Sequence, residues 1–387
     1  MTGFVSGNRI KLLRTGTEYF PALEAAFDAA RREICIETYI FEDDITGRRI
    51  AQALMRAARR GVAIHVLLDG FGSKDLGEEL LQEMGSCGVR VLKYRPDISP
   101  WTLRRERLRR MHRKIVVVDA RVAFVGGINV IDDMHTPRQT PPRFDYAVRI
   151  EGPLLADIYP VVTRLWTLVM WTQLHQRWHN PATSIHAGRC GKQRAAFVVR
   201  DNFRHRKDIE NAYLDAIARA KSEIMIASAY FFPGRSFRRA LVDAAARGVR
   251  VILLLQGRVE YVLLHYAARA LYGAFLAAGI EIHEYRRSFM HAKVAVVDDR
   301  WSTVGSSNID PMSLLLAREA NVVIDDAGFA RELRRSLNDA MEKGAHQVHR
   351  ASWKKQPLQA RVMNWICYEL VRFLTGWSSY GRAREFK

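Results

Sequence analysis

Short apolar runs that predict buried strands alternate with amphipathic segments that predict helices along most of the chain. The same order of segments then occurs a second time. Three segments of the first half match three of the second in residue type and order: 33–41 with 223–231, 57–69 with 244–256, and 88–95 with 279–286. In the second pair a helix is expected to end at a glycine, Gly61 or Gly248, directly before an apolar strand. The chain is therefore interpreted as an internal duplication.

The duplication predicts an α/β fold of two similar sandwich domains related by a pseudo-twofold axis, with helices flanking a mostly parallel sheet. The matching segments place the first domain at 1–170 and the second at 197–345. Residues 171–196 are rich in Gln, His, Arg, Asn and Gly and are expected to be a linker. The remaining 346–387 is expected to be a basic amphipathic segment.

Composition changes this picture mainly through charge. The 60 Lys and Arg residues exceed the 41 Asp and Glu residues, which gives a formal net charge of +19 at pH 7. This excess favours anionic partners such as nucleic acid, acidic lipid or a phosphorylated substrate, although a solvated surface without a partner has the same composition.

The four scattered cysteines favour a reducing compartment and argue against a disulfide scaffold or a zinc site. No stretch approaches the roughly 18 apolar residues of a membrane span, so we expect a soluble or peripheral protein.

One spacing of polar residues is rarer than the elements around it and occurs once in each half. The first copy consists of His112, Lys114 and Asp119, followed by Gly126, Gly127 and Asn129. The second copy consists of His291, Lys293 and Asp298, followed by Gly305, Ser306 and Asn308. A single His-x-Lys-x4-Asp pattern arises by chance, but two copies with the same Gly and Asn downstream indicate a duplicated site. The alternative is a duplicated scaffold in which these are ordinary strand residues.

The residue types of this motif suit chemistry at phosphorus. Side chains at i and i+2 of a strand share a face, so each histidine is expected to project with its lysine. A neutral imidazole can attack phosphorus and a protonated one can give a proton to the leaving alcohol, because the ordinary pKa of histidine is about 6.5. The lysines and asparagines would stabilise charge on the phosphoryl oxygens, and the glycines would allow a tight turn. Asp119 and Asp298 lie at an odd offset and are expected to be structural supports near the site.

The duplicated motif resembles the phospholipase D superfamily, and the resemblance covers nearly the whole chain. Four segments look like bacterial cardiolipin synthases of the short B-type, which lacks N-terminal membrane spans: 37–41, 68–73, 110–119 and 304–311. The resemblance implies two phospholipase D-like domains and an enzyme that needs no metal ion or other cofactor. It also implies that a phosphatidyl group is carried on a histidine and then transferred to an alcohol.

The resemblance also implies roles for the motif residues. His112 and His291 would be the nucleophile and the general acid/base, with His112 favoured as the nucleophile. The residues expected to grip the phosphodiester are Lys114, Lys293, Asn129 and Asn308. The catalytic motif as a whole includes the two aspartates, Asp119 and Asp298.

An acidic residue after the Gly-x-Asn element orients each imidazole in the family, because the second ring nitrogen needs a partner that fixes the tautomer. The matching residues here are Asp145 and Glu319, although each also fits a solvated strand end. Gly126 would lie beside the phosphate in the first half. The second half departs from the first where Ser306 stands in place of Gly127, so the two halves would not be equivalent if the serine hydroxyl assists.

Two segments suggest how the chain would hold a lipid. The first copy has a basic insert, 96–110, directly before His112, whose arginines would bind a headgroup unless the insert is simply a charged solvated helix. Residues 362–374 carry an apolar stripe at helical spacing, which fits either a helix in the membrane interface or packing on the protein's own core. The stripe consists of Val362, Trp365, Ile366, Leu370, Phe373 and Leu374.

The leading hypothesis is a phosphatidyltransferase that makes cardiolipin. Phosphatidylglycerol or phosphatidylethanolamine would donate the phosphatidyl group, and the glycerol hydroxyl of another phosphatidylglycerol would accept it. The partner would be an anionic phospholipid membrane, with the protein peripheral on the cytoplasmic face of the cell membrane. One chain supplies both motifs, so no dimer is needed to complete the site. The alternatives are a phosphodiesterase acting on nucleic acid or hydrolysing phospholipid, and a non-enzymatic binder of anionic surfaces; the apolar stripes favour lipid over nucleic acid.

Overall fold

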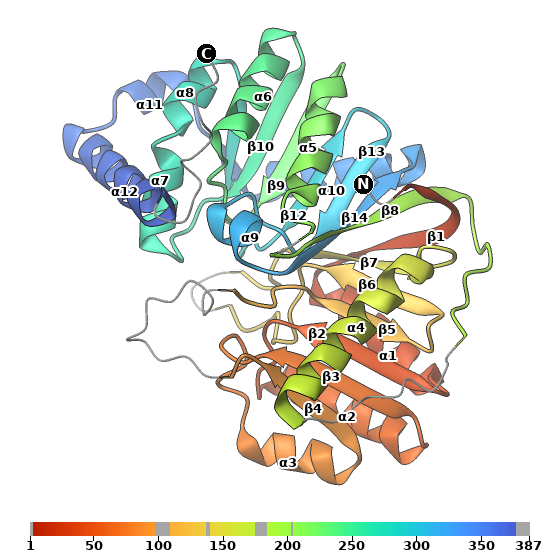
Figure 1. The fold of residues 1–387 in the computed structure, drawn as a ribbon. Helices are drawn as coiled ribbons and strands as arrows, with labels where there is room; N and C mark the ends of the chain where they lie inside the picture. The colour runs from red at the N-terminus through yellow and green to blue at the C-terminus, as the bar shows by residue number, and fades with distance from the viewer. Residues whose placement is uncertain (1–2, 97–108, 137–139, 175–183, 203, 377–387) are drawn as a thin grey trace.

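A computed structural model describes residues 3–96, 109–136, 140–174, 184–202 and 204–376 of the chain (Figure 1). The predicted basic insert at 96–110 falls almost entirely outside the described residues, as does the middle of the predicted linker. The ends of that linker lie in a helix and a strand, and the domain boundaries themselves stay a prediction.

The described elements of the two halves follow the same order. The first half contains β1 (Val5–Arg14), α1 (Thr15–Ala29), β2 (Glu33–Thr38), α2 (Ile45–Arg59), β3 (Ala63–Asp69), α3 (Glu78–Ser86), β4 (Val89–Tyr94), β5 (Ile115–Val118), β6 (Val122–Gly126), β7 (Tyr146–Glu151) and α4 (Leu155–Leu174). The second half contains β8 (Gln193–Arg200), α5 (Asp208–Arg219), β9 (Glu223–Ser228), α6 (Arg235–Ala246), β10 (Arg250–Gln256), α7 (Val262–Arg269), α8 (Tyr272–Ala277), β11 (Glu281–Tyr285), β12 (Lys293–Val297), β13 (Trp301–Gly305), α9 (Pro311–Leu315), β14 (Glu319–Asp325) and α10 (Ala327–Gly344). The chain continues with β15 (Ala345–Gln347), α11 (Arg350–Lys354) and α12 (Leu358–Gly376).

The described strands form one sheet of 15 strands, in the order β15-β11-β10-β9-β12-β13-β14-β8-β1-β7-β6-β5-β2-β3-β4. The antiparallel pair of β1 and β8 lies at its centre and joins the halves. Outward from this pair both halves have the same strand order, and β15 adds a short edge strand to the second half. The predicted α/β fold of two similar halves is therefore confirmed.

The sheet is mixed, which corrects the expectation that it would be mostly parallel. Among the described strands, parallel pairs occur within β2, β3 and β4 and within β9, β10 and β11. The strands around β1 and β8 pair antiparallel. The reason is connection length, because only the turns 119–121 and 298–300 join β5 to β6 and β12 to β13. Such short turns join antiparallel neighbours, whereas parallel neighbours need a longer crossover such as α2.

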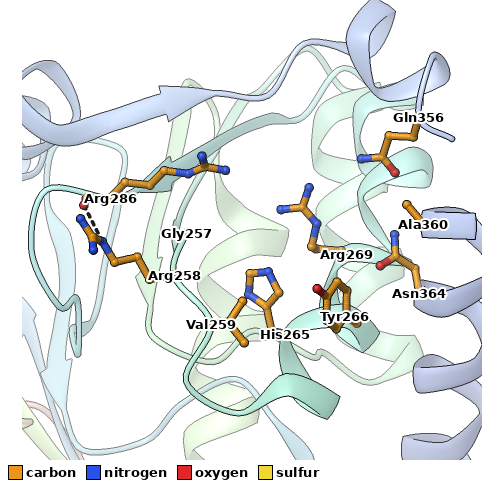
Figure 2. A pocket seen from close by; sticks show the side chains of 10 residues that line it. All are labelled: Gly257, Arg258, Val259, His265, Tyr266, Arg269, Arg286, Gln356, Ala360 and Asn364. Carbon is orange, nitrogen blue, oxygen red and sulfur yellow. Dashed lines mark hydrogen bonds between the residues drawn. The ribbon is translucent and has the colours of Figure 1, made fainter. Parts of the chain in front are cut away.

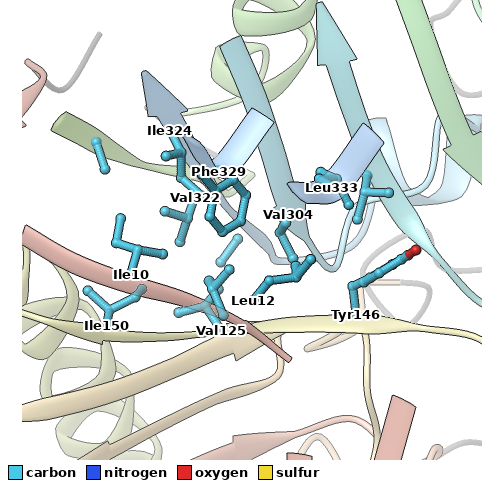
Figure 3. Packing of buried hydrophobic residues seen from close by; sticks show 14 of the residues in the cluster. Ile10, Leu12, Val125, Tyr146, Ile150, Val304, Val322, Ile324, Phe329 and Leu333 are labelled. Atoms are coloured by element: carbon cyan, nitrogen blue, oxygen red, sulfur yellow. The ribbon is translucent and has the colours of Figure 1, made fainter. Parts of the chain in front are cut away.

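The halves pack against each other through one face of each part of the sheet. Helices α1, α2 and α3 cover the outer face of the first half, and α5, α6 and α8 cover that of the second (Figure 1). The inner faces enclose a shared hydrophobic core together with α4 and α10. In this core Leu12 and Val125 from the first half cluster with Val322 and Phe329 from the second (Figure 3). The packed interface fixes the loops of the two halves relative to each other, and the candidate site lies at this interface.

Local signals in the sequence account for several element boundaries. Gly61 and Gly248 follow α2 and α6 with φ of 86° and 87°, the left-handed conformation expected at a helix C-terminus. Asp44 and Asp326 begin α2 and α10 by accepting hydrogen bonds from backbone N–H groups of the first turn. None of the helices that the structure describes is both long and apolar enough to cross a bilayer.

Candidate active site

The segments that carry the two motif histidines are held at the interface between the halves. His112 and His291 lie just before β5 and β12, and each is hydrogen-bonded to the opposite half. The backbone N–H of His112 donates to the carbonyl of Arg318 at 3.0 Å, and that of His291 donates to the carbonyl of Phe144 at 2.8 Å. Arg318 and Phe144 directly precede the acidic residues predicted to act on the histidines. The pseudo-twofold arrangement therefore brings each histidine to the other half's carboxylate.

The two carboxylates contact the histidines across the interface. Nδ1 of His112 lies 2.9 Å from Oε1 of Glu319, and Nδ1 of His291 lies 2.7 Å from Oδ2 of Asp145. Glu319 is fully buried and Asp145 is 4% exposed, so neither is a solvated strand end. An ionised carboxylate only accepts, so Nδ1 of each ring carries the proton whenever its partner is ionised. The lone pair of the neutral ring is then on Nε2, the nitrogen available to a substrate.

The motif lysines are buried beside the histidines. Nζ of Lys114 donates to the carbonyl oxygen of His112 at 2.8 Å, and Nζ of Lys293 donates to that of His291. Burial lowers the pKa of Lys114 to about 7, and that of Lys293 to about 8, despite nearby carboxylates. A bound phosphodiester anion would offset this cost by giving both ammonium groups a counter-charge.

The histidines are also biased toward the neutral form. Burial lowers the pKa of His112, and Glu319 partly opposes the shift. Burial is the main cause that holds the pKa of His291 well below its usual range, and the positive charges of Lys293 and Lys114 lower it further. Burial raises the pKa of Asp145 to about 7, although Lys293 opposes this shift. Near neutral pH the site therefore offers neutral imidazoles, which can attack or accept a proton.

The serine-for-glycine difference between the halves lies directly at the carboxylates. The hydroxyl of Ser306 donates to Oε2 of Glu319 at 2.5 Å. At the matching position in the first half, a Cβ on Gly127 would overlap the carboxylate of Asp145. One oxygen of Glu319 therefore accepts a hydrogen bond from a serine. In the first half there is no room for a serine at residue 127, because the Asp145 carboxylate lies where its Cβ would be.

The other predicted phosphate-side residues are buried around these groups. Oδ1 of Asn129 accepts from the backbone N–H of Ile40 at 3.3 Å. Oδ1 of Asn308 is buried and has no hydrogen-bond partner among the described residues. Gly126 ends β6, and its N–H donates to the carbonyl of Lys114 at 3.3 Å. The asparagine that each copy places after its motif strand is thus buried, at 5% exposed for Asn129 and 3% for Asn308.

Asp119 and Asp298 are supports, but they do not lie near the histidines, which corrects the expected placement. They follow β5 and β12, at the opposite ends from the histidines. The carboxylate of Asp119 accepts from backbone N–H groups of residues 31–33, and that of Asp298 from those of 221–223. Each aspartate therefore fixes the start of the neighbouring strand, β2 or β9. Seven residues of chain that contain a whole strand therefore separate each aspartate from its motif histidine.

Sequence reasoning missed two polar side chains that position the histidine segments. Oδ2 of buried Asp69 accepts from the N–H of Met111 at 2.8 Å, directly before the first histidine. Nε2 of Gln256 donates to the carbonyl of Met290 at 3.2 Å, directly before the second. The signal was present, because both residues close the same matched segment and are polar at the end of an apolar strand.

An aromatic contact on one side was also missed. The ring of Tyr39 lies edge-on to that of His112, with 4.9 Å between centroids, and Nζ of Lys114 lies 5.3 Å from the Tyr39 centroid. The matching residue of the other half is Ala229. Among the described residues, no group of His, Cys, Asp or Glu side chains is arranged to hold a metal ion. The paired imidazoles and ammonium groups can carry out acid–base and nucleophilic chemistry at phosphorus.

Comparisons with known proteins agree on one family. The family model described as "Cardiolipin synthase, PLD-like domain" matches residues 23–157 and 213–341. Cardiolipin synthase B of Escherichia coli strain K12 is 40% identical over 374 residues, which cover 96% of this chain and 90% of that protein. Cardiolipin synthase B of Salmonella typhimurium strain LT2 is 40% identical over 387 residues, with 97% and 91% covered.

A solved structure shows the same fold at low sequence identity. The crystal structure of phosphatidylserine synthase from Haemophilus influenzae Rd KW20 superposes with a TM-score of 0.73 and 12% identity, covering 98% of this chain and 96% of that one. This likeness concerns the fold alone. The duplicated motif, the paired halves and the extent of the sequence match together place the chain in the phospholipase D-like cardiolipin synthase family.

Proposed function

We propose that this protein is a cardiolipin synthase, a phosphatidyltransferase that works through a phosphatidyl-histidine intermediate. The observation that carries the proposal is the crossed arrangement, in which each motif histidine contacts a buried carboxylate of the other half. This arrangement supplies two oriented imidazoles and two buried ammonium groups at one interface. The identity to cardiolipin synthases supports phospholipid substrates.

In the first step Nε2 of His112 attacks the phosphorus of phosphatidylglycerol. The P–N bond forms as the bond from phosphorus to the headgroup glycerol oxygen breaks. The anionic phosphodiester, once bound beside Lys114 and Lys293, offsets the positive charges that, besides burial, hold the pKa of His291 low, so His291 is protonated for this step; it gives its proton to the departing oxygen, and free glycerol leaves. Lys114, Lys293 and the buried asparagine amides stabilise negative charge on the phosphoryl oxygens. With phosphatidylethanolamine as donor, the same step would release ethanolamine.

In the second step the headgroup glycerol of another phosphatidylglycerol enters the space left by the first. His291, now neutral, accepts a proton from its terminal hydroxyl, and the oxygen attacks phosphorus as the bond to His112 breaks. The product is cardiolipin, and both histidines return to their starting states. Holding the acceptor hydroxyl next to the intermediate gives transfer an advantage over attack by water.

The site also supports proposals about partners and placement. The net charge of +19 suits an anionic phospholipid membrane, and the substrates are bilayer lipids. We assign the protein to the cytoplasmic face of the cell membrane as a peripheral protein. One chain provides both histidines and both carboxylates, so the proposed site needs no second subunit. No cofactor takes part in the proposed steps.

The test is mass spectrometry of lipids after the purified protein is incubated with phosphatidylglycerol vesicles. We expect cardiolipin with the unsubstituted protein, none with His112→Ala, and at most about a hundredth of the parent amount with His291→Ala. Isotope-labelled phosphatidylethanolamine in a second set of vesicles identifies the donor. Phosphatidic acid as the sole product would contradict transfer and indicate hydrolysis. Cleavage of DNA or RNA without any lipid product would replace the proposal with the nucleic-acid phosphodiesterase.

A further inference from the structure

The apolar stripe of the last described helix faces away from the protein. Trp365, Ile366 and Leu370 of α12 are 61%, 48% and 45% exposed. The side chains of α12 that are buried lie on another face and include Cys367 and Val371, at 7% and 4% exposed. The stripe predicted from the sequence is therefore not the face that packs on the core. An exposed stripe of this kind is typical of a surface that meets an apolar environment.

The helix against which α12 packs also begins with exposed apolar side chains. α12 packs along α7 on the flank of the second half (Figure 1). Tyr261 and Val262, at the start of α7, are 56% and 60% exposed, and Val362 of α12 is 45% exposed. We call Tyr261, Val262, Val362, Trp365, Ile366 and Leu370 the α7–α12 surface. Tyrosine and tryptophan are the aromatic residues most suited to the interface between water and lipid.

A basic pocket opens between the same two helices. It has a volume of about 480 Å³, and Arg258, Arg269 and Arg286 line it together with Asn364 of α12 (Figure 2). None of the described residues that line it is acidic. Arg269 and Arg286 share the carboxylate of Glu284, so these two guanidinium groups have one carboxylate between them, and Nε of Arg258 donates to the carbonyl of Arg286 at 2.8 Å. The pocket thus has excess positive charge and the size of a small ligand site.

We propose that this flank docks on an anionic phospholipid bilayer, with the α7–α12 surface in the interface and one lipid phosphate in the pocket. The inference deepens the proposed function, on which it rests only for the bilayer origin of the substrates. Guanidinium groups bind phosphate through two hydrogen bonds at once. Apolar and interfacial aromatic side chains beside a basic pocket match a bilayer, which offers acyl chains and phosphates side by side.

A second copy of the chain is a poorer occupant of the same flank. In a twofold contact the same patch meets itself, so the basic pockets of both copies would be brought together. Bringing two pockets with the same excess positive charge together is unfavourable, because like charges repel and would lose water. A lipid bilayer instead supplies the opposite charge.

Docking here would also bring the bilayer close to the catalytic residues. Gln256, at the end of β10, bonds the residue before His291. Arg258, two residues later, lines the basic pocket, and the connection then leads into α7. A lipid held at this flank is therefore separated from the histidine segment by one short loop.

The test measures vesicle binding of the full chain with His112→Ala, so that lipid turnover does not enter. Flotation compares vesicles of phosphatidylcholine with vesicles that also contain phosphatidylglycerol. Substituting both Trp365→Ser and Ile366→Ser is expected to weaken binding at least about tenfold, because half-exposed apolar surface is no longer buried in lipid. Arg258→Ser is expected to weaken binding about fivefold, on the anionic vesicles alone.

Matched controls remove exposed residues elsewhere. The apolar control is Ile45→Ser, at a residue of α2 that is 79% exposed. The basic control is Arg239→Ser, at a residue of α6 whose side chain is 85% exposed. Both should bind like the parent. Equal binding by the Trp365/Ile366 variant and the Ile45 control would overturn the proposal. So would light scattering showing that the α12 substitutions dissociate an oligomer while vesicle binding stays unchanged.

A separate assay keeps this inference distinct from the proposed function. With both histidines present, the Trp365/Ile366 variant is given short-chain phosphatidylglycerol as dissolved monomers. Turnover of monomers should stay within about twofold of the parent, while turnover of vesicle lipid falls with binding. Loss of monomer turnover would contradict a role confined to docking. Binding without any turnover by the parent would instead contradict the transferase proposal.

Discussion

The surroundings of His112 differ from those of His291 although the same backbone frame holds both. Nδ1 of His112 contacts Glu319, whose other oxygen accepts from Ser306 at 2.5 Å. The ring of Tyr39 lies edge-on at 4.9 Å. The His112 imidazole is therefore positioned by the Glu319 carboxylate, which Ser306 hydrogen-bonds in turn, and by the ring of Tyr39.

His291 has a simpler environment. Its carboxylate partner, Asp145, is one methylene shorter and fills the space where a side chain on Gly127 would lie. The residue that matches Tyr39 is Ala229, and the ring of Phe289 stacks on His291 with 6.3 Å between centroids. The difference teaches that duplication kept the frame for two imidazoles while giving each its own electrostatic surroundings. Such a difference is what the proposed division into nucleophile and general acid requires.

The largest expected effects come from removing the histidines. His112→Ala should lower kcat at least about 10⁴-fold and prevent a covalent enzyme, because the attacking atom is gone. His291→Ala should lower kcat about 10²- to 10⁴-fold on phosphatidylglycerol, as loss of a general acid does.

A substrate with a nitrophenol leaving group needs no acid and should still label His112 in the His291→Ala variant. Intact-protein mass spectrometry detects the label, and labelling of His112→Ala instead would reverse the assignment.

The carboxylates should have the next largest effects. Glu319→Gln and Asp145→Asn are each expected to lower kcat about 10²- to 10⁴-fold with little change in KM, because Nδ1–H loses its charged acceptor and the tautomer is no longer fixed. Steady-state kinetics on mixed micelles measures both. Glu319→Asp, which keeps the charge, serves as the control and should lose less. Unchanged kcat in either amide variant would remove that carboxylate from the mechanism.

The serine-for-glycine pair should have intermediate effects. Gly127→Ser would push the Asp145 carboxylate from its place and is expected to lower kcat about 10- to 100-fold. Ser306→Ala removes one hydrogen bond to a buried carboxylate and is expected to lower kcat about tenfold. Thermal unfolding of both proteins checks that the fold is intact. Equal, small effects of the two changes would mean that the halves are equivalent at this position.

The lysines predict a smaller effect that depends on pH. With pKa values of about 7 for Lys114 and about 8 for Lys293 in the unliganded site, both cations lose charge as the pH rises from 6 to 9. KM for a soluble short-chain phosphodiester should therefore rise about tenfold over this range. Lys293→Arg keeps its charge and should flatten the rise above pH 8. A KM that is constant to pH 9 in the unsubstituted protein would contradict the expected titration.

The smallest effect on catalysis is expected at the remote aspartates. Asp119→Ala or Asp298→Ala leaves backbone N–H groups without an acceptor, which should lower the free energy of unfolding by about 1–3 kcal/mol. The value of kcat should stay within about threefold, since neither carboxylate lies near a histidine. Urea denaturation and kinetics on the same preparations separate the two readouts. A large loss of kcat at unchanged stability would return these residues to the site.

Much of the fold follows from local patterns. The matched apolar segments 33–41 and 223–231 contain β2 and β9, and Gly61 and Gly248 end helices as expected. Strand direction was not predicted correctly, since an apolar run looks the same in a parallel or antiparallel pair. The short turns after β5 and β12 decide it.

The candidate site divides in the same way. Repetition of one rare spacing identifies His112, Lys114, His291 and Lys293 without any knowledge of the fold. The sequence alone also marks Glu319 and its counterpart in the first half as acidic residues that open strands. It does not say which histidine each carboxylate contacts, because partners 207 and 146 residues apart in the chain are joined only by packing.

The sequence by itself therefore determined the duplication, the pairs of imidazole and ammonium groups and the amphipathic character of α12. These properties depend on residue type and spacing within a few turns of chain. Tertiary structure alone decided the crossing of the carboxylates, the remote position of Asp119 and Asp298, and the outward direction of the α12 stripe. Each of these depends on how two sheet faces and their helices pack, and the shared core between the halves fixes that packing.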